Sequence, residues 1–406
     1  MWGNFFSTPG GRVAANRTTT EEPSLTIIRP PRSAFRRKRF LVPFVPSVLV
    51  ALIGVISLVV SGNVVLKLDR IVVLEGKIAS KAEFFTDDAV RRILMSHGIQ
   101  VHLTQVGSRE IATSDLDGYD FVFPSGKPTG LLIRNRLQEE GKSFIAYRPF
   151  FSPVVLASFR DYAEALVRQG TAKPQPGPLY YDLSMDGFVG LMREGTTWRK
   201  LGQDNGNLVL AQTPDVCWSN TAGTYLGLVA SVTNGNRAPV TEAEALDLAT
   251  KIKPWLLSQG MSNEDIPRMY FAPEGRGFAP VVVIYEHQFL AHQLRVKAQT
   301  GAVDAKRVLL YPEAQLQSVP EFIGLTESGV RLGELLTADP ALRKRALELG
   351  LRVLQRDGTL YERQVSEFLG EHGIDPPAIG VGDTEAVLPA LPLLEKMIVE
   401  VGGCKR

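Results

Sequence analysis

Residues 70–106 read RIVVLEGKIASKAEFFTDDAVRRILMSHGIQVHLTQV, and this stretch decides the fold. Arg70–Leu74 is a short run rich in β-branched residues, and Lys81–His97 repeats apolar side chains at helical spacing. Gly98 follows at the position where a glycine typically ends a helix. Ile99–Val106 then alternates apolar and polar residues. The stretch therefore predicts a strand, a helix and a second strand.

The same rhythm continues further along the chain. Asp120–Phe123 and Lys142–Arg148 read as a third and a fourth strand, with a helix near 130–139 between them. This βαβαβαβ order predicts a parallel sheet with helices on both faces. In a second alternating block, Glu242–Ser258 reads as an amphipathic helix and Val281–Tyr285 as a strand buried on both faces. The fold class is therefore α/β.

An uncharged apolar run occupies residues 40–66, directly after the basic cluster Arg36–Arg39. About 20 apolar residues cross a hydrocarbon core as a helix, and basic residues flank the cytoplasmic end. We therefore expect a disordered basic cytoplasmic tail at 1–39, a single transmembrane helix at 40–66, and an extracytoplasmic remainder. A signal peptide cleaved near Ser61-Gly62 is the alternative, although its apolar region is usually shorter.

Composition limits the remaining choices. The chain has 406 residues, a net charge of +2 and 22% charged residues, which are ordinary globular values. The near-neutral charge argues against a nucleic-acid partner. The spacing of the histidines and cysteines predicts no metal site and no cofactor. Cys217 and Cys404 are the two cysteines, and the sequence leaves their pairing open.

Small polar residues stand repeatedly where strands end and helices begin. Ligands of open parallel sheets bind at the carboxyl ends of strands, beside helix N-termini. The predicted ligand-binding residues are Lys77, Ser80, Lys81, Ser108, Arg109, Ser125, Ser152, Thr213, Asp215, Ser219, Asn220, Tyr285 and Glu286. Two purely structural interpretations remain open: each hydroxyl is an ordinary helix cap, and Arg109 forms a surface ion pair. Tyr285-Glu286 points either into a cleft or into a hinge.

The order of these segments resembles a known family. The segments that carry the likeness are Glu75–Lys77 with Ser80–Phe85, Val106–Arg109, Tyr119–Ser125, Arg148–Val155, Thr213–Asp215 with Ser219–Gly223, Pro280–Glu286 and Val308–Pro312. Over roughly residues 68–355 the chain resembles the extracytoplasmic solute-binding proteins of bacterial transport systems, with the type 2 periplasmic-binding architecture.

The resemblance implies a two-lobe clamp made of two parallel-rich sheets flanked by helices. Lobe 1 would comprise 68–150 and 287–355, and lobe 2 would comprise 151–286. The resemblance places the first crossing between lobes at Arg148–Val155, the return crossing at Pro280–Glu286, and a first-lobe strand at Val308–Pro312. Residues 356–406 form a C-terminal helical extension that a minimal clamp lacks.

Three functions follow as hypotheses. The first is a noncatalytic, membrane-tethered protein that captures a small polar or anionic ligand between its lobes, for transport or sensing with a membrane partner. The second is a ligandless scaffold. The third is a serine hydrolase that uses Ser108 or Ser219, for which His97, His102, His287 and His292 are available as bases.

Overall fold

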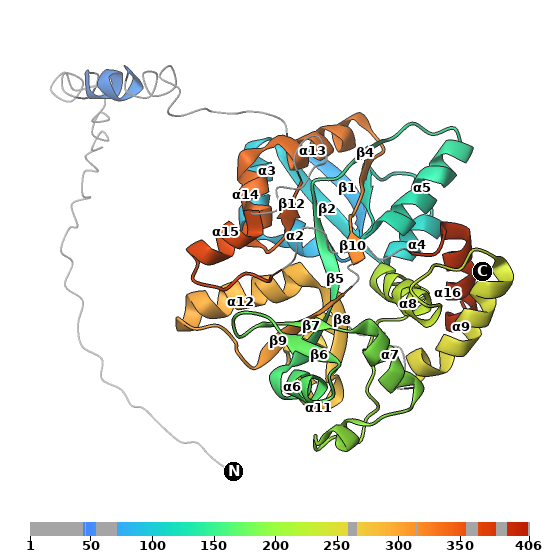
Figure 1. Ribbon diagram of the computed structural model, residues 1–406. Coiled ribbons are helices and arrows are strands. Elements are labelled where there is room, and N and C mark those ends of the chain that lie inside the picture. The colour runs from blue at the N-terminus through green and yellow to red at the C-terminus, as the bar shows by residue number, and fades with distance from the viewer. Residues whose placement is uncertain are drawn as a thin grey trace, which may run out of the picture. The chain divides into compact units, whose positions relative to one another are not determined.

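The computed structural model describes residue 44 and residues 46–53, 71–258, 266–313, 316–354, 364–378 and 388–404. The folded body begins after residue 70 (Figure 1). The predicted tail at 1–39 lies outside the described residues. So does the predicted membrane helix at 40–66, apart from residue 44 and the helical residues 46–53. Within the described ranges, no helix has both the length and the hydropathy that a membrane crossing requires.

The first sheet has, among the described residues, five strands in the order β2-β1-β3-β11-β4. They are β1 Val72–Ile78, β2 Ile99–Gln105, β3 Phe121–Phe123, β4 Ile145–Tyr147 and β11 Phe322–Gly324. β1 pairs in parallel with β2 and with β3, as predicted. β11 lies antiparallel between β3 and β4, so the sheet is mixed. β11 lies about 200 residues after β3 in the sequence, so the local alternation of strands and helices cannot predict that these two strands pair.

Helices cover both faces of the first sheet, and its central strand β3 is apolar and buried on both sides. Successive residues of a strand point to opposite faces, so Phe121 and Phe123 join one core while Val122 joins another. The first face carries α2 Ala82–Thr86, α3 Asp88–Ser96, α13 Glu327–Ala338 and α14 Pro340–Glu348; the second carries α4 Ser108–Thr113 and α5 Lys127–Glu139 (Figure 1). We call this sheet with its helices lobe 1.

The helix expected at Lys81–His97 is divided in two by Asp87. Its backbone is extended (φ −65°, ψ 130°), and its carboxylate accepts hydrogen bonds from the amides of Ala89 and Val90. An aspartate in this arrangement caps the helix that follows it, so α3 begins anew after α2. Gly98 ends α3 with φ 71°, as the sequence predicts.

The second sheet has the order β10-β5-β9-β7-β6 in the described chain, with β8 and β12 also pairing with β5. Its strands are β5 Phe150–Phe159, β6 Ala172–Pro174, β7 Tyr180–Leu183, β8 Val281–Tyr285, β9 Arg307–Pro312, β10 Leu316–Ser318 and β12 Arg352–Val353. β5 is antiparallel to β8, β9, β10 and β12, and only the β7–β9 strand pair is parallel. The prediction of a second parallel-rich sheet is therefore wrong.

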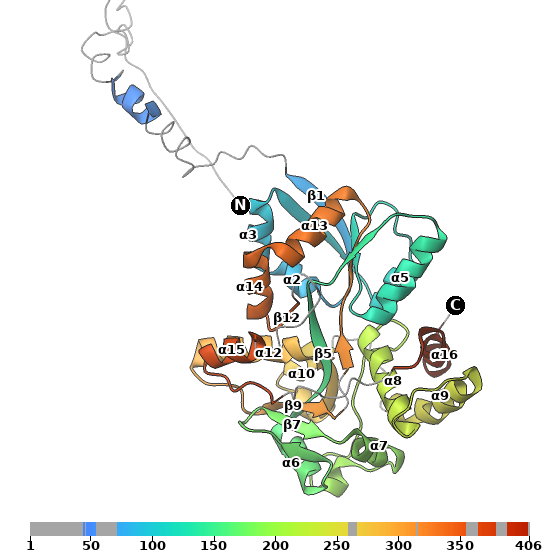
Figure 2. The same cartoon turned by 45° about the horizontal axis from the view of Figure 1, so that its top comes forward.

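Helices also surround the second sheet, and together they form lobe 2 (Figure 2). They are α6 Arg160–Arg168, α7 Met185–Arg193, the 3-10 helix η2 Trp198–Leu201, α8 Asn220–Thr233, α9 Glu242–Leu257, α10 Ile266–Phe271, α11 Gly275–Phe278, α12 Glu286–Thr300, α15 Gln364–Glu371 and α16 Leu391–Gly402. The C-terminal extension belongs to this lobe, because Leu369, Met397 and Val401 are buried in its core.

β5 links the two lobes, where the resemblance places the first crossing. All ten of its residues are buried. Phe150 packs in the core of lobe 1, whereas Val154 and the residues that follow pack in the core of lobe 2. One continuous buried strand therefore joins the cores.

Residues 287–312, which form α12 and β9, lie in lobe 2, whereas the resemblance implies lobe 1 for them. β8 does not return to lobe 1 at Pro280–Glu286, because it runs into α12, whose Phe289 and Leu290 are buried in lobe 2. β9, expected in lobe 1, pairs with β5 and β7 instead. The return runs through β10, which pairs with β5, to β11 in the first sheet. The assignment of residues 287–312 to lobe 1 is therefore wrong.

Candidate functional site

A cavity of about 530 Å³ lies between the two lobes. Its walls come from the loops after β1, β2 and β3 on one side, and from the start of α8 and the end of β8 on the other. Six of the predicted ligand-binding residues line it: Ser80, Ser108, Ser125, Ser219, Asn220 and Tyr285. The structure thus brings residues more than 200 positions apart to one hollow.

The three lobe 1 serines form a hydrogen-bonded cluster. The hydroxyls of Ser80 and Ser125 lie 2.6 Å apart, and the amide of Ser80 donates to Oγ of Ser125 at 3.0 Å. The amide of Ser125 donates to Oγ of Ser108 at 2.9 Å. Each serine follows one of three adjacent strands, β1, β2 and β3. Parallel strands end at the same edge of a sheet, which is why these serines meet.

Asn220 forms the lobe 2 wall opposite this cluster. Ser219 caps α8 by accepting from the amide of Ala222 at 3.3 Å, which leaves Asn220 at the first helical position. Its Oδ1 accepts from the hydroxyl of Thr129 in lobe 1 at 3.4 Å. A Cβ on Gly126 would lie 2.2 Å from Nδ2 of Asn220, so a residue without a side chain permits this approach. The lobes therefore touch at the edge of the cavity.

Tyr285 closes the end of the cavity nearest the crossing strands. It ends β8 and precedes α12, and its ring is 2% exposed. The ammonium nitrogen of Lys81 lies 3.5 Å from the centre of that ring. Burial lowers the pKa of Lys81 to about 7, while the carboxylate of Glu83 acts to raise it.

The neighbouring Glu286 points into the hinge. Its carboxylate is fully buried and accepts two hydrogen bonds from Arg352 of β12, at 2.6 and 2.7 Å, and one from the hydroxyl of Tyr311 at 2.7 Å. The two hypotheses for Tyr285-Glu286 therefore both hold, one for each residue.

Other predicted residues have partners within the protein and lie outside the cavity lining. Nζ of Lys77 donates to Oγ of Ser114 and to the carbonyl of Asp115, at 2.9 and 2.8 Å. Oγ of Ser152 accepts from the amide of His287 at 3.0 Å.

Two members of the predicted set, Thr213 and Asp215, lie in the loop before α8. Thr213 is buried. Asp215 accepts from the amide of Cys217 at 2.7 Å and so shapes this loop rather than the cavity wall.

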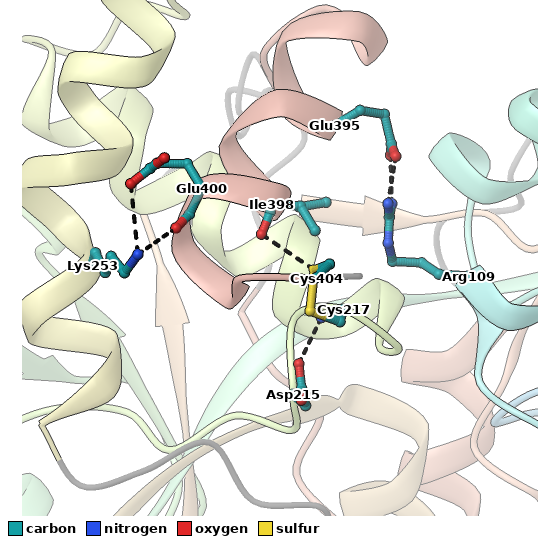
Figure 3. The surroundings of a disulfide bond; sticks show 8 residues. All are labelled: Arg109, Asp215, Cys217, Lys253, Glu395, Ile398, Glu400 and Cys404. Carbon is teal, nitrogen blue, oxygen red and sulfur yellow. Dashed lines mark hydrogen bonds and ion pairs between the residues drawn. A yellow bond between two sulfur atoms is a disulfide. The ribbon is translucent and has the colours of Figure 1, made fainter. Parts of the chain in front are cut away.

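Arg109 forms an ion pair with the C-terminal helix α16. Its guanidinium pairs with both carboxylate oxygens of Glu395 on α16 (Figure 3). The amide of Arg109 also donates to the carbonyl of Trp218 at 3.3 Å. Arg109 therefore forms an ion pair, but the pair is part-buried and joins the two lobes, whereas the sequence suggested a pair on the surface.

A disulfide joins Cys217 to Cys404, so the pairing that the sequence left open is settled. The bond ties the end of α16 to the loop that leads into Ser219 and Asn220 (Figure 3). Nζ of Lys253 on α9 donates to the carbonyl of Glu400 at 2.7 Å and further holds α16 against lobe 2. The C-terminal extension thus braces the lobe 2 wall of the cavity and contacts lobe 1 through Glu395.

Sequence reasoning missed several cavity residues, among them Trp218 and Gln288. Trp218 is 52% exposed, which is unusual for a large aromatic side chain and typical of a binding rim. Trp218 directly precedes the predicted site residue Ser219, and this position could have identified it as a candidate for the cavity wall. Gln288 lies one helical turn into α12, where the sequence offers no such mark.

The hydrolase hypothesis finds no support in these contacts. Within the described chain, His97 pairs with Asp339, His102 with Glu75 and His292 with Asp304. His287 is buried, and its backbone amide donates to Oγ of Ser152, while Oγ of Ser108 and Oγ of Ser219 accept from the amides of Ser125 and Ala222. The described residues also contain no group of three acidic, histidine or cysteine side chains that could hold a metal ion.

Comparisons with known proteins bear on the fold alone. No protein-family model matches the chain, and no curated protein matches it in sequence. The solved structure of the ferric binding protein from Campylobacter jejuni matches 81% of this chain and 98% of its own, with a TM-score of 0.50 and 12% identity. The chain has a type 2 periplasmic-binding fold.

Two further structures with this fold match over similar lengths. Iron-bound HitA from Pseudomonas aeruginosa covers 82% of this chain and 99% of its own, with a TM-score of 0.49 and 14% identity. The substrate-binding protein of an ABC transporter from Agrobacterium tumefaciens covers 82% and 95%, with a TM-score of 0.48 and 11% identity. In the present chain, the disulfide joins α16 to the loop before α8, and the Arg109–Glu395 ion pair joins α16 to lobe 1.

Proposed function

We propose that this protein is a noncatalytic, extracytoplasmic solute-binding protein that captures a small polar or anionic molecule between its lobes. The observation that carries the proposal is the cavity itself, because serines at three strand ends of lobe 1 face Ser219, Asn220 and Tyr285 of lobe 2. Hydroxyl and amide groups at such an edge suit the recognition of polar ligands. The ferric binding protein from Campylobacter jejuni, whose solved structure shares the fold, is a binding protein.

Hinged closure would take place where the chain passes between the lobes, which it does at β5, at the return through β10, and again between β12 in lobe 1 and α15 in lobe 2. Two-lobe folds of this kind close around a ligand by small changes at such crossings. Capture on behalf of a transporter or a sensor in the membrane is part of this proposal.

A ligandless scaffold is the second candidate, and specific contacts favour it. The Arg109–Glu395 ion pair and the Thr129–Asn220 hydrogen bond join the lobes through protein groups alone. A clamp held in this way could present a fixed surface to a partner.

Thermal unfolding of the full-length protein with a panel of amino acids, sugars, carboxylates and inorganic oxyanions separates the two candidates. A ligand that binds only the native state raises the melting temperature in a saturable manner. We expect at least one compound to do so with the wild type. Ser80→Phe, which places a ring in the cavity, should abolish the rise, whereas Ser96→Phe on the exposed side of α3 should retain it. A panel that never shifts the wild type would favour the scaffold.

The tether is a further part of the proposal. The apolar run at 40–66 after a basic cluster supports a single membrane helix with a cytoplasmic N-terminus. The Cys217–Cys404 disulfide supports an oxidising compartment for the remainder.

Membrane fractionation tests this topology. In carbonate-washed vesicles the chain should stay with the membrane, and protease added to spheroplasts should digest residues beyond 71 while sparing an N-terminal tag. Release of the chain into the soluble periplasmic fraction at a reduced mass would instead indicate a cleaved signal peptide.

A further inference from the structure

Three buried polar side chains at the crossing end of the cavity have atoms without partners. Nζ of Lys81, Oη of Tyr285 and Nδ1 of His287 form no hydrogen bond with any described atom. The three residues are 1%, 2% and 4% exposed. The Tyr285 ring lies over the Lys81 amine and its centre is 5.7 Å from that of the His287 ring. Lys81, Tyr285 and His287 therefore form one cluster of buried polar side chains at this end of the cavity.

Such a cluster is costly for the fold, because buried polar groups are normally hydrogen-bonded and buried charges are normally paired. Lys77 shows the usual solution in the same lobe, since its amine has two hydrogen-bond partners. Strained or unsatisfied groups of this kind concentrate at ligand sites.

The cavity lining contains one more donor without a hydrogen-bond partner among the described residues. Nδ2 of Asn220 is buried and has no hydrogen-bond partner in the described chain. Asn220, Tyr285 and Ser80, the neighbour of Lys81, all line the cavity. An amine, a phenol and an amide N–H₂ group are all donors, which is the set that an anion requires.

We propose that Lys81, Tyr285 and Asn220 form a subsite for a singly charged carboxylate or oxyanion, with Lys81 as the specificity-determining cation. This inference rests on the proposed solute-binding function and names its ligand class. Tyr285 lines the cavity whereas Lys81 does not, so the anion reaches the amine when the Tyr285 ring turns aside. One buried ammonium group balances one negative charge.

The subsite should couple binding to a proton. The groups that face the amine are Glu83 on α2, the Tyr285 ring at the end of β8, and His287 on α12. The pKa of Lys81 is lowered to about 7 by its burial, and that of His287 is lowered well below 6.5 by burial and by Lys81. The imidazole is therefore neutral at pH 7. A bound anion favours the ammonium form, so above pH 7 binding takes up a proton and affinity falls by about tenfold per pH unit.

The experiment measures thermal unfolding of the full-length protein with sodium acetate, lactate, formate and nitrate, which keep one negative charge at both pH values, and with glucose and glycerol as neutral solutes, at pH 6.5 and 8.5. We expect a saturable rise with at least one anion at pH 6.5 and an affinity more than tenfold weaker at pH 8.5. Lys81→Met should lose this response while melting at a higher temperature without anion, because its side chain suits a dry site. Lys77→Met should melt at a lower temperature and keep the response.

The outcomes separate this inference from the proposed function. An anion response that persists in Lys81→Met, or that is equal at the two pH values, overturns the subsite. A response to neutral solutes alone overturns the subsite and leaves the solute-binding function standing, and the absence of any response contradicts both. If Lys81→Met does not fold, calorimetry of the wild type in buffers of different ionisation enthalpy decides: proton uptake on binding supports the subsite, and none overturns it.

Discussion

Replacing Arg352 with methionine is expected to lower the free energy of unfolding by about 3–5 kcal/mol, because it leaves a buried charge without its partner. The carboxylate of Glu286 is fully buried and would retain only the hydroxyl of Tyr311. Arg352 lies beside Val353 in the core of lobe 1, whereas Glu286 begins the helix whose Phe289 packs in lobe 2. The pair therefore stabilises the hinge. Urea-induced unfolding followed by fluorescence measures the loss.

Two control variants test whether the loss of stability comes from the unpaired buried charge. Lys251→Met removes an exposed partner of Asp247 on α9 and should change stability by less than about 0.5 kcal/mol. The double variant Arg352→Met with Glu286→Met removes both charges and should recover most of the stability, since an apolar pair can replace a buried ion pair. If Arg352→Met proves as stable as the wild type, the hinge does not depend on this pair.

Removing the disulfide with Cys217→Ser and Cys404→Ser is expected to lower the free energy of unfolding by about 2–5 kcal/mol. The bond closes a loop of 187 residues and so restricts the unfolded chain strongly. The native contacts of α16 should survive, because Met397, Ile398 and Val401 remain buried in lobe 2. Calorimetric unfolding of both forms, with and without dithiothreitol, measures the difference.

Reductant supplies the internal control. The chain has two cysteines, so dithiothreitol should not change the melting temperature of the double serine variant. The reduced wild type should melt at the same temperature as this variant. A wild type whose melting temperature is unaffected by complete reduction, verified by alkylation and mass, would show that the bond does not stabilise the fold.

Part of the site could be predicted from the sequence because it depends on local order. Ser80, Ser108 and Ser125 each follow a strand, and the strands lie side by side in one parallel group. The carboxyl ends of such strands share an edge, so the convergence of the three serines follows from the alternation alone. That they bind a ligand stays a prediction.

The assignment of segments to lobes could not be predicted in the same way. β9 and β11 are short apolar strands of similar appearance, yet one joins the second sheet and the other joins the first. Pairing between strands depends on packing against partners far along the chain, which β-branched composition does not specify. The sequence order therefore misplaced residues 287–312.

The contacts of Arg109 and Cys217 show the same limit. Arg109 meets Glu395 across 286 positions, and Cys217 meets Cys404 across 187. Both partners belong to a C-terminal extension that the resemblance does not include. An arginine at a helix start reads equally well as a ligand clamp or as an ion pair, and only the position of α16 decides between them.

We propose that the cavity between the two lobes holds one small solute. Isothermal titration calorimetry of the full-length protein, with the compound that most raises its melting temperature, tests this claim directly. We predict one site per chain, binding weakened about 5- to 100-fold in Asn220→Ala by loss of a buried donor, and no binding in Ser80→Phe. Equal affinity in all three proteins, or a stoichiometry other than one, would contradict it.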